Sequence, residues 1–299
     1  MAILRAGSDA VNPMQQSGDQ GTIVESAGPW PFITQKVALR AGGLRETVSA
    51  RLHRKGLAST ASLVEHRLLA GLWQPRRLNW WIGTVFALGA ALFALGSVLS
   101  LAPELAHCVS MDNAAIGAVY FAGSIPFTTA AYLQLYQAAN APAWEAGPQQ
   151  PPRARRWLGW RPRNIGWVSC ALQFAGTLLF NINTFDGMRT DMGWLREDVA
   201  VWAPDVVGSV LFLASGYLAF AETCHRHFAW LPASLSWWVT SFNLLGCVAF
   251  MVSAVYAFVS PDPGGFGDGT LAVAFTLVGA LGFLAGSLLM LPEAAPARA

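Results

Sequence analysis

Apolar residues gather into six long segments between residues 75 and 293, with short polar connections between them. Each segment holds few or no charged side chains and runs for about 20 residues, the length that crosses a ~30 Å hydrocarbon core as a helix. The segments lie at 80–102, 114–137, 165–185, 202–222, 237–260 and 271–291. The pattern predicts an all-α, polytopic membrane protein with six transmembrane helices.

The residues before these segments follow other patterns. Residues 1–31 hold few large apolar side chains, so we expect them to be disordered. For residues 32–74 we predict a cytoplasmic or interfacial amphipathic helical region. Leu44, Val48 and Leu52 recur every four residues among basic side chains, and Ser62 and Glu65 have capping-box spacing. Such helices either lie on anionic lipid headgroups or form a small soluble pair, and both readings stay open.

The placement of charge predicts the orientation in the membrane. Only 12% of the residues are charged and 54% are hydrophobic, whereas soluble proteins carry about 25% charged residues. Of the 19 basic residues, 17 fall before the first segment, in the second and fourth connections, or after the last segment; the remaining two are Arg189 and Arg196. Because basic residues concentrate on the cytoplasmic side, both termini are predicted to be cytoplasmic.

One motif, W-x-P-x4-W-x8-G-x3-F, occurs three times and leads into every odd-numbered segment. Its copies begin at Trp73, Trp160 and Trp230. The even segments share a weaker pattern. The sequence thus predicts three tandem two-helix hairpins, at about 73–137, 160–222 and 230–293, around a pseudo-threefold axis along the membrane normal. Small residues allow close helix contacts, which we expect at Gly89, Gly176, Gly246, Gly117, Gly208 and Gly279.

Uncharged polar residues occur inside the apolar segments. Gln173 and Asn243 share one repeat position, where the first repeat has Phe86, while Asn181 and Asn183 lie further along. Such amides either form hydrogen bonds between helices, worth ~0.6 kcal/mol on average, or line a path between the repeats. An unpartnered amide facing lipid costs several kcal/mol. We therefore predict that Gln173 and Asn243 point inward, around a packed and nearly dry centre.

A second polar cluster closes the fourth segment. Glu222 and His225 are three residues apart, a spacing found in metal sites of helical bundles, with Cys224 and His227 close by. Glu293 closes the sixth segment in the same way. We favour the simpler interpretation of a polar helix end, because no second Glu-x-x-His is present. We therefore predict no metal, no cofactor and no catalytic residue, and no nucleic-acid partner, since topology explains the basic clusters.

Two short sequence runs resemble a known family of membrane proteins. Phe93-Ala94-Leu95-Gly96-Ser97 and Phe283-Leu284-Ala285-Gly286-Ser287 resemble the YrhK-like membrane domain. The stretch from Trp230 to Trp238 is similar to a group of uncharacterised actinobacterial membrane proteins. The resemblance implies a bacterial inner-membrane location and implies nothing about activity.

Three classes of function fit these observations. The sequence favours a membrane scaffold or partner-binding protein, whose protein partner it does not identify. The alternative is a small-solute transporter or channel with a path along the pseudo-threefold axis. A membrane enzyme, with its site at the Glu222–His227 end, is the least favoured class.

Overall fold

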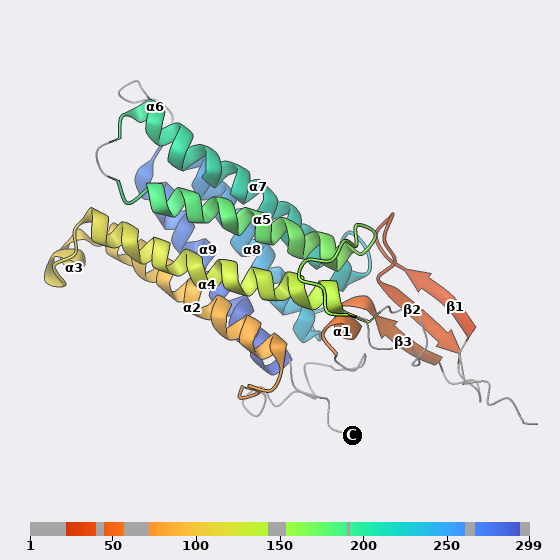
Figure 1. Cartoon of the computed structure of the whole chain (residues 1–299). Helices are drawn as coiled ribbons and strands as arrows, with labels where there is room; N and C mark the ends of the chain where they lie inside the picture. Colours follow the sequence, from red (N-terminus) through yellow and green to blue (C-terminus); the bar gives the residue numbers. More distant parts are fainter. Residues whose placement is uncertain are drawn as a thin grey trace, which may run out of the picture.

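The computed structural model describes residues 22–39, 45–56, 72–142, 154–189, 192–260 and 267–293. Among these residues, six helices are long and apolar enough to cross a membrane, as the sequence predicted. Figure 1 shows them side by side in one bundle, with a small β-sheet at one end. We call this the sheet end, and we call the opposite end, which carries the short helices α3 (Pro103–Cys108) and α6 (Trp194–Glu197), the far end.

The bounds of the long helices lie within a few residues of the predicted segments. A π-helical turn, η1 (Asp198–Trp202), joins α6 to the fourth of them. At the sheet end, the side chains of Asn164 and Ser234 accept hydrogen bonds from the backbone N–H groups of Trp167 and Trp237 and so cap the third and fifth helices. The six are α2 (Leu78–Leu101), α4 (Asn113–Asn140), α5 (Ile165–Asp186), α7 (Ala203–Cys224), α8 (Leu235–Tyr256) and α9 (Gly269–Glu293).

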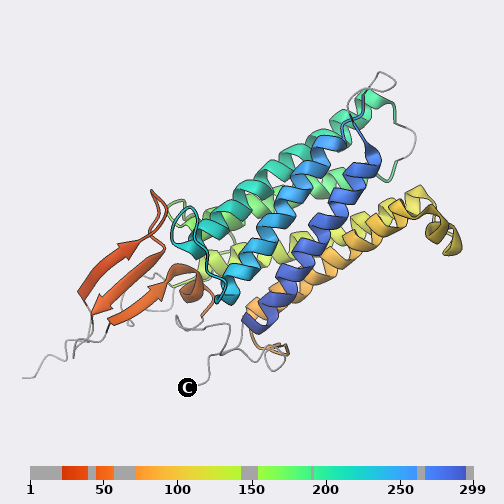
Figure 2. The ribbon, with the colours of Figure 1, turned by 180° about the vertical axis from the view of Figure 1, so that it is seen from behind.

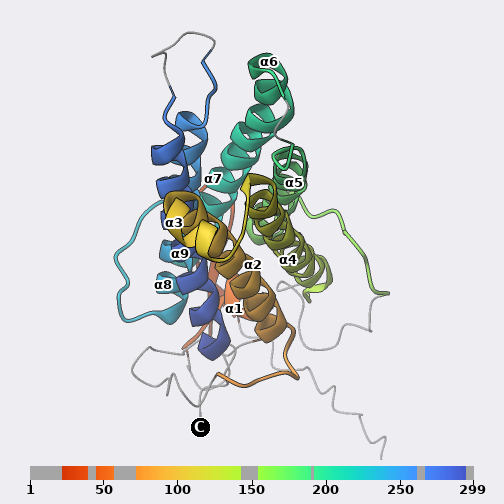
Figure 3. The same ribbon diagram turned by 90° about the vertical axis from the view of Figure 1, so that its left-hand side faces the viewer.

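The six helices form a closed ring in chain order. Each packs against the next, from α2 through α4, α5, α7 and α8 to α9, and α9 packs back against α2. Figure 2 shows α9 lying between α8 and α2, and Figure 3 shows the bundle from the far end. The ring therefore encloses an interior to which every helix contributes.

Glycine contacts of one kind join the two helices of each hairpin. A Cβ atom added to Gly89 would lie 2.6 Å from the ring of Phe127, and one added to Gly176 or Gly246 would lie 2.7 Å from the ring of Phe212 or Phe283. In each case a backbone carbonyl of the facing helix is also near. These positions exclude a larger side chain, because the two backbones approach too closely.

The facing glycines are Gly123, Gly208 and Gly279. Their absent Cβ atoms would in turn meet the rings of Phe93, Phe180 and Phe250. Gly117, which the sequence pattern aligned with Gly208 and Gly279, instead faces the backbone of Gly187 and Met188. The alignment of the first even helix was therefore wrong by six residues. Apolar side chains surround both glycines of α4, and each is followed by phenylalanine at the fourth position, as Gly208 and Gly279 are, so the sequence pattern alone fits either register.

The tryptophans of the motif also have the same surroundings three times. The indole N–H groups of Trp80, Trp167 and Trp237 donate to backbone carbonyls at 2.7, 3.0 and 2.9 Å. The earlier tryptophan of each copy packs edge-on against the later one, with ring centroids 4.8 to 5.3 Å apart. Each earlier tryptophan is exposed and each later one is buried. This arrangement suits the headgroup layer, where an indole meets both apolar and polar surroundings.

In the described residues before the helix ring, a sheet and a short helix stand in place of the first predicted amphipathic helix. Three antiparallel strands, β1 (Thr22–Ala27), β2 (Gln35–Leu39) and β3 (Arg45–Ser49), form a sheet of order β1-β2-β3. A short helix, α1 (Ala50–Arg54), follows directly. Val48 therefore lies in a strand and Leu52 in a helix, so their four-residue spacing does not mark one helix. β-Branched Thr47 and Val48 suit the strand.

The sheet also departs from the predicted disorder of residues 1–31 and from the all-α fold class. β1 lies within the stretch 1–31 that the composition predicts to be disordered, and the all-α prediction is wrong for the sheet. Disorder predicted for residues 1–21, and the second amphipathic helix that begins at Ser62, fall outside the described residues.

The sheet is fastened to the helix ring through the loop between β1 and β2. The hydroxyl of Thr34 is fully buried and lies 3.0 Å from Nδ1 of His225, the residue that ends α7 in a left-handed conformation. The carbonyl of Thr34 also accepts a hydrogen bond from the backbone N–H of Ala50 at 2.8 Å. Together these bonds place α1 against the sheet end of the ring.

Candidate functional site

A layer of phenylalanine rings fills the middle of the helix ring. Neighbouring rings have centroids 4.8 to 6.1 Å apart, mostly edge-on or tilted, the arrangement that aromatic pairs prefer. The space left between them is about 10 Å³, which is close to the minimum that holds one water molecule. The layer consists of the six buried residues Phe93, Phe127, Phe180, Phe212, Phe250 and Phe283.

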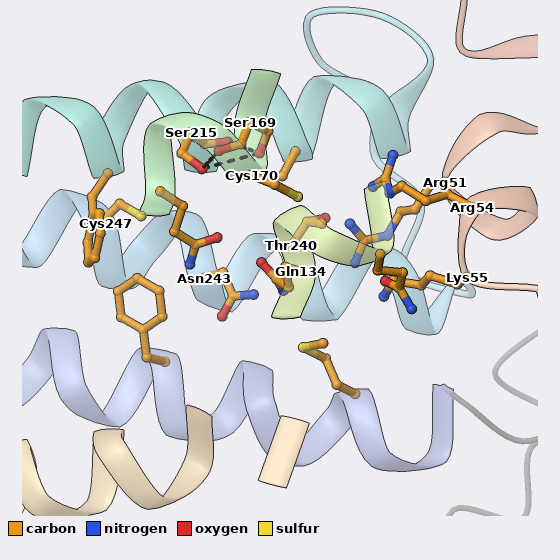
Figure 4. A pocket seen from close by; sticks show the side chains of 17 residues that line it. Arg51, Arg54, Lys55, Gln134, Ser169, Cys170, Ser215, Thr240, Asn243 and Cys247 are labelled. Atoms are coloured by element: carbon orange, nitrogen blue, oxygen red, sulfur yellow. Dashed lines mark hydrogen bonds between the residues drawn. The ribbon is translucent and has the colours of Figure 1, made fainter. Parts of the chain in front are cut away.

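A polar cavity of about 50 Å³, which we call the inner cavity, lies between this layer and α1. Phe212 and Phe283 of the layer form its floor, and three basic residues of the α1 segment form its roof. Figure 4 shows these basic side chains reaching in from one end, toward Asn243 and Thr240. The polar residues of its wall are Gln134, Gln137, Ser169, Gln173, Ser215, Thr240 and Asn243.

Buried ion pairs hold the roof to two helix ends. Arg54 donates two hydrogen bonds to the Glu222 carboxylate, at 2.6 and 2.9 Å. Lys55 donates to Glu293 at 2.5 Å, and Nε of Arg51 lies 3.6 Å from the same carboxylate. All five side chains are almost fully buried. Removing one partner of such a pair leaves an uncompensated buried charge.

The surroundings of the roof shift the pKa values of its bases. Burial lowers the pKa of Arg54, but Glu222 outweighs it and raises the pKa overall. Burial lowers the pKa of Lys55 to about 8, with Arg51 acting in the same direction and Glu293 opposing. Gly166, in the first turn of α5, makes room for the roof, because a Cβ atom there would overlap the guanidinium group of Arg54.

A larger space, the outer cavity, lies on the other side of the phenylalanine layer. It has a volume of about 210 Å³ and shares Phe93, Phe180 and Phe250 with the layer. Asp205 is the one carboxylate in its lining. A groove of about 500 Å³ at the far end shares Gly117, Tyr120 and Gly187 with the outer cavity. The groove, outer cavity, phenylalanine layer and inner cavity thus follow one another through the ring.

The amides singled out in the sequence have different environments. Gln173 and Asn243 line the inner cavity, and Phe86 is buried against Phe127. Asn181 instead accepts a hydrogen bond from Thr128 of α4 at 3.1 Å. Asn183 donates to the carbonyl of Val201 at 3.0 Å and also lines the outer cavity. The expected hydrogen bonds between helical segments are therefore present at Asn181 and Asn183, whereas Gln173 and Asn243 line a small cavity.

The polar residues that end α7 do not converge on one point. The Cys224 thiol donates to the carbonyl of Ala229, His225 pairs with Thr34, and His227 lies 2.7 Å from the hydroxyl of Tyr217. Glu222 and Glu293 are held by the bases of the roof. Among the described residues, no group of three or more His, Cys, Asp or Glu side chains could hold a metal ion. This helix end is an anchor for the N-terminal region.

Sequence reasoning missed the roof and part of the wall of the inner cavity. Aligning the first even helix through Gly123 reveals a sequence signal for these residues. Fourteen residues beyond the second glycine of each hairpin come Gln137, Glu222 and Glu293, whereas alignment through Gly117 had put Ala131 in the first place. Two acids at matching helix ends require nearby bases, and the run from Arg51 to Lys55 supplies them.

Comparison of the chain with protein-family models, with curated proteins and with solved structures found no match. The class therefore follows from the fold, and six apolar spanning helices indicate a multi-pass integral membrane protein. Its distinguishing feature is an interior divided by a phenylalanine layer into two unequal spaces, of which the inner one is the more polar.

Proposed function

We propose that the protein provides a gated path for a small solute through the centre of its helix ring. The observation that carries the proposal is the row of spaces on both sides of the phenylalanine layer, each with some polar lining residues and joined by shared lining residues. In this conformation the path is closed twice, by the layer and by the roof. A path of this kind needs only a modest displacement of rings, because the layer already leaves a small space at its centre.

We also propose that the three hairpins are internal repeats related by a pseudo-threefold axis along the path. The matching tryptophan pairs and the matching glycine contacts support this. The 17-to-2 distribution of basic residues supports a cytoplasmic sheet end and cytoplasmic termini, with the outer cavity facing the other side. A bacterial inner membrane and membership of a YrhK-like group remain proposals from the sequence resemblance, as does binding of other N-terminal basic residues to anionic lipid.

The path is a better-supported proposal than the scaffold that the sequence favoured. Arg51, Arg54 and Lys55, three of the bases expected to meet lipid or a partner, are buried beneath the sheet. The enzyme reading loses its main support, because Glu222 and His225 are engaged with Arg54 and Thr34. A scaffold would need no space inside the ring, so solute movement separates the two classes directly.

Opening the phenylalanine layer tests the proposal. The full chain in proteoliposomes is compared with Phe250→Ala, using uptake of labelled chloride and labelled urea. We expect the variant to admit at least one probe faster than the unaltered protein. Phe185→Ala is the matched control, because Phe185 lies at the far end of α5 and is exposed.

Native cysteines give a second readout that does not depend on the probe. Cys170 and Cys247 line the inner cavity, whereas Cys108 is exposed at the far end and is replaced by serine. A membrane-impermeant thiol reagent applied at the far end should label the inner cavity in Phe250→Ala, but not in Phe185→Ala. A folded Phe250→Ala protein that shows neither uptake nor labelling would overturn the path and leave the scaffold.

A further inference from the structure

The charges around the inner cavity do not balance. Its roof carries three bases, Arg51, Arg54 and Lys55, and the described residues that contact them supply two carboxylates, Glu222 and Glu293. Three positive charges against two negative charges leave one positive charge over. Isolated buried charge is costly, so a site of this kind attracts a counter-ion.

The surplus falls on Arg51. Glu222 is fully engaged by Arg54, and Glu293 is closer to Lys55, at 2.5 Å, than to Nε of Arg51, at 3.6 Å. Arg51 is only 7% exposed, and its Nε has no hydrogen-bond partner among the described residues. Its guanidinium lines the inner cavity, so the unsatisfied base borders an enclosed space.

The wall of the inner cavity carries amide side chains that have no hydrogen-bond partner among the described residues. Gln134, Gln137, Gln173 and Asn243 line the cavity, and their side chains form no hydrogen bond with the described residues. Oδ1 of Asn243 is buried without a partner. The amide N–H groups of these side chains are donors that suit a halide or an oxyanion, whereas the hydroxyl of Thr240 already donates to the carbonyl of Ser236 at 3.0 Å. The side-chain donors and the charge therefore favour the same class of ligand.

The corrected repeat alignment explains why the surplus exists. Gln137, Glu222 and Glu293 hold the same position in the three hairpins, so the roof faces two acids and one neutral amide. A carboxylate at position 137 would complete the set and cancel the charge. Gln137 lines the same cavity as Arg51, so a carboxylate at position 137 would border the same space as the base with the longest contact to a carboxylate.

We propose that the inner cavity binds one small monovalent anion between Arg51 and the amides of its wall. The volume of about 50 Å³ corresponds to a few water-sized groups, at 10–15 Å³ for each. That fits chloride, nitrate or formate and excludes larger organic anions. The inference deepens the proposed function by naming the solute class, and only its link to transport rests on the proposed path.

Binding is tested on the full chain in detergent, kept in gluconate and titrated with chloride and then with nitrate. Thermal stability reports binding, because a ligand that binds the native state stabilises it. We expect saturable stabilisation by both anions and none from added gluconate. Gln137→Glu should lower the affinity by at least about tenfold, since it adds a negative charge within several ångströms of the anion. Arg51→Gln should lower it likewise, and Arg51→Lys should keep most of it.

Arg51→Gln and Gln137→Glu together distinguish loss of the anion site from loss of folding. Arg51→Gln could weaken the roof, but Gln137→Glu supplies Arg51 with a partner and should fold at least as well as the unaltered chain. Equal stabilisation of Gln137→Glu and the unaltered protein by chloride would overturn the site, as would absence of any chloride or nitrate effect. Anion binding with neither uptake nor thiol labelling in Phe250→Ala liposomes would refute the path and leave the site standing. Uptake of urea without anion binding would refute the anion site and leave the path standing.

Discussion

The inner and outer cavities are formed by the same helices but are closed in different ways. The outer cavity holds about 210 Å³, has one carboxylate, and borders a groove at the far end. The inner cavity holds about 50 Å³ and is roofed by three bases that come from outside the ring. The ring alone therefore sets the position of the phenylalanine layer. The N-terminal segment makes the two sides unequal, and substitutions on either side test how large this difference is.

The largest effect is expected from removing a carboxylate beneath the roof. Glu222→Ala leaves the Arg54 guanidinium buried without its bidentate partner, which costs about 3–5 kcal/mol for pairs of this kind. Denaturant unfolding of the detergent-solubilised protein measures the loss. Glu104→Ala, an exposed acid at the far end, serves as the control. A loss of equal size in the two variants would mean that the roof does not stabilise the protein.

A methyl group at a glycine contact should have the next largest effect. Gly246→Ala places a Cβ atom 2.7 Å from the ring of Phe283 and 3.0 Å from a backbone carbonyl. Overpacking of this kind costs about 1–3 kcal/mol. Gly269→Ala is the matched control, because nothing lies within 4 Å of that position. Thermal stability measures both, and tolerance of alanine at Gly246 would contradict the close helix contact.

The roof should respond to pH, whereas the phenylalanine layer should not. Lys55 has a lowered pKa of about 8, so the unfolded chain binds more protons between that value and the ordinary lysine pKa near 10.5. Stability contributed by this group should therefore rise with pH in that window, by at most about 1.4 kcal/mol per pH unit. The charged groups that face it are Arg51, Arg54, Glu222 and Glu293.

Unfolding measured between pH 7 and 10 tests this sign. Lys55→Met should flatten the curve, and Lys36→Met, in the sheet, should leave it unchanged. Chloride stabilisation should fall over the same range, because loss of the Lys55 proton cancels the surplus charge. A chloride effect that stays constant to pH 10 would contradict the charge balance of the inner cavity.

The smallest effect is expected in the outer cavity. Asp205 lines it and forms no hydrogen bond with the described residues. Its ionised form repels an anion that enters from the far end, so Asp205→Asn should raise chloride uptake a few-fold in the Phe250→Ala background. Urea uptake should stay unchanged and is the internal control. A fall in chloride uptake would mean that Asp205 assists entry.

The sequence predicted the spanning helices because crossing a bilayer requires long apolar runs, and these are visible without any partner. It did not predict the sheet, because the residues 43–56 carry an apolar spacing that fits either one helix or a strand followed by a short helix. It also did not predict the roof. Arg51, Arg54 and Lys55 look like lipid-binding residues until Glu222 and Glu293 are placed beneath them. That pairing joins residues more than 160 positions apart, which no local pattern records.

The long separation of the roof partners has a consequence for biosynthesis. α1 leaves the ribosome before any spanning helix, whereas Glu222 follows 168 residues later and Glu293 follows Lys55 by 238. The three basic side chains therefore stay hydrated and without their carboxylate partners until α7 and finally α9 have entered the bilayer. The full set of ion pairs forms only when the ring is complete. In a chain that stops before α9, Glu293 is absent and the roof is not fully held to the helix ends.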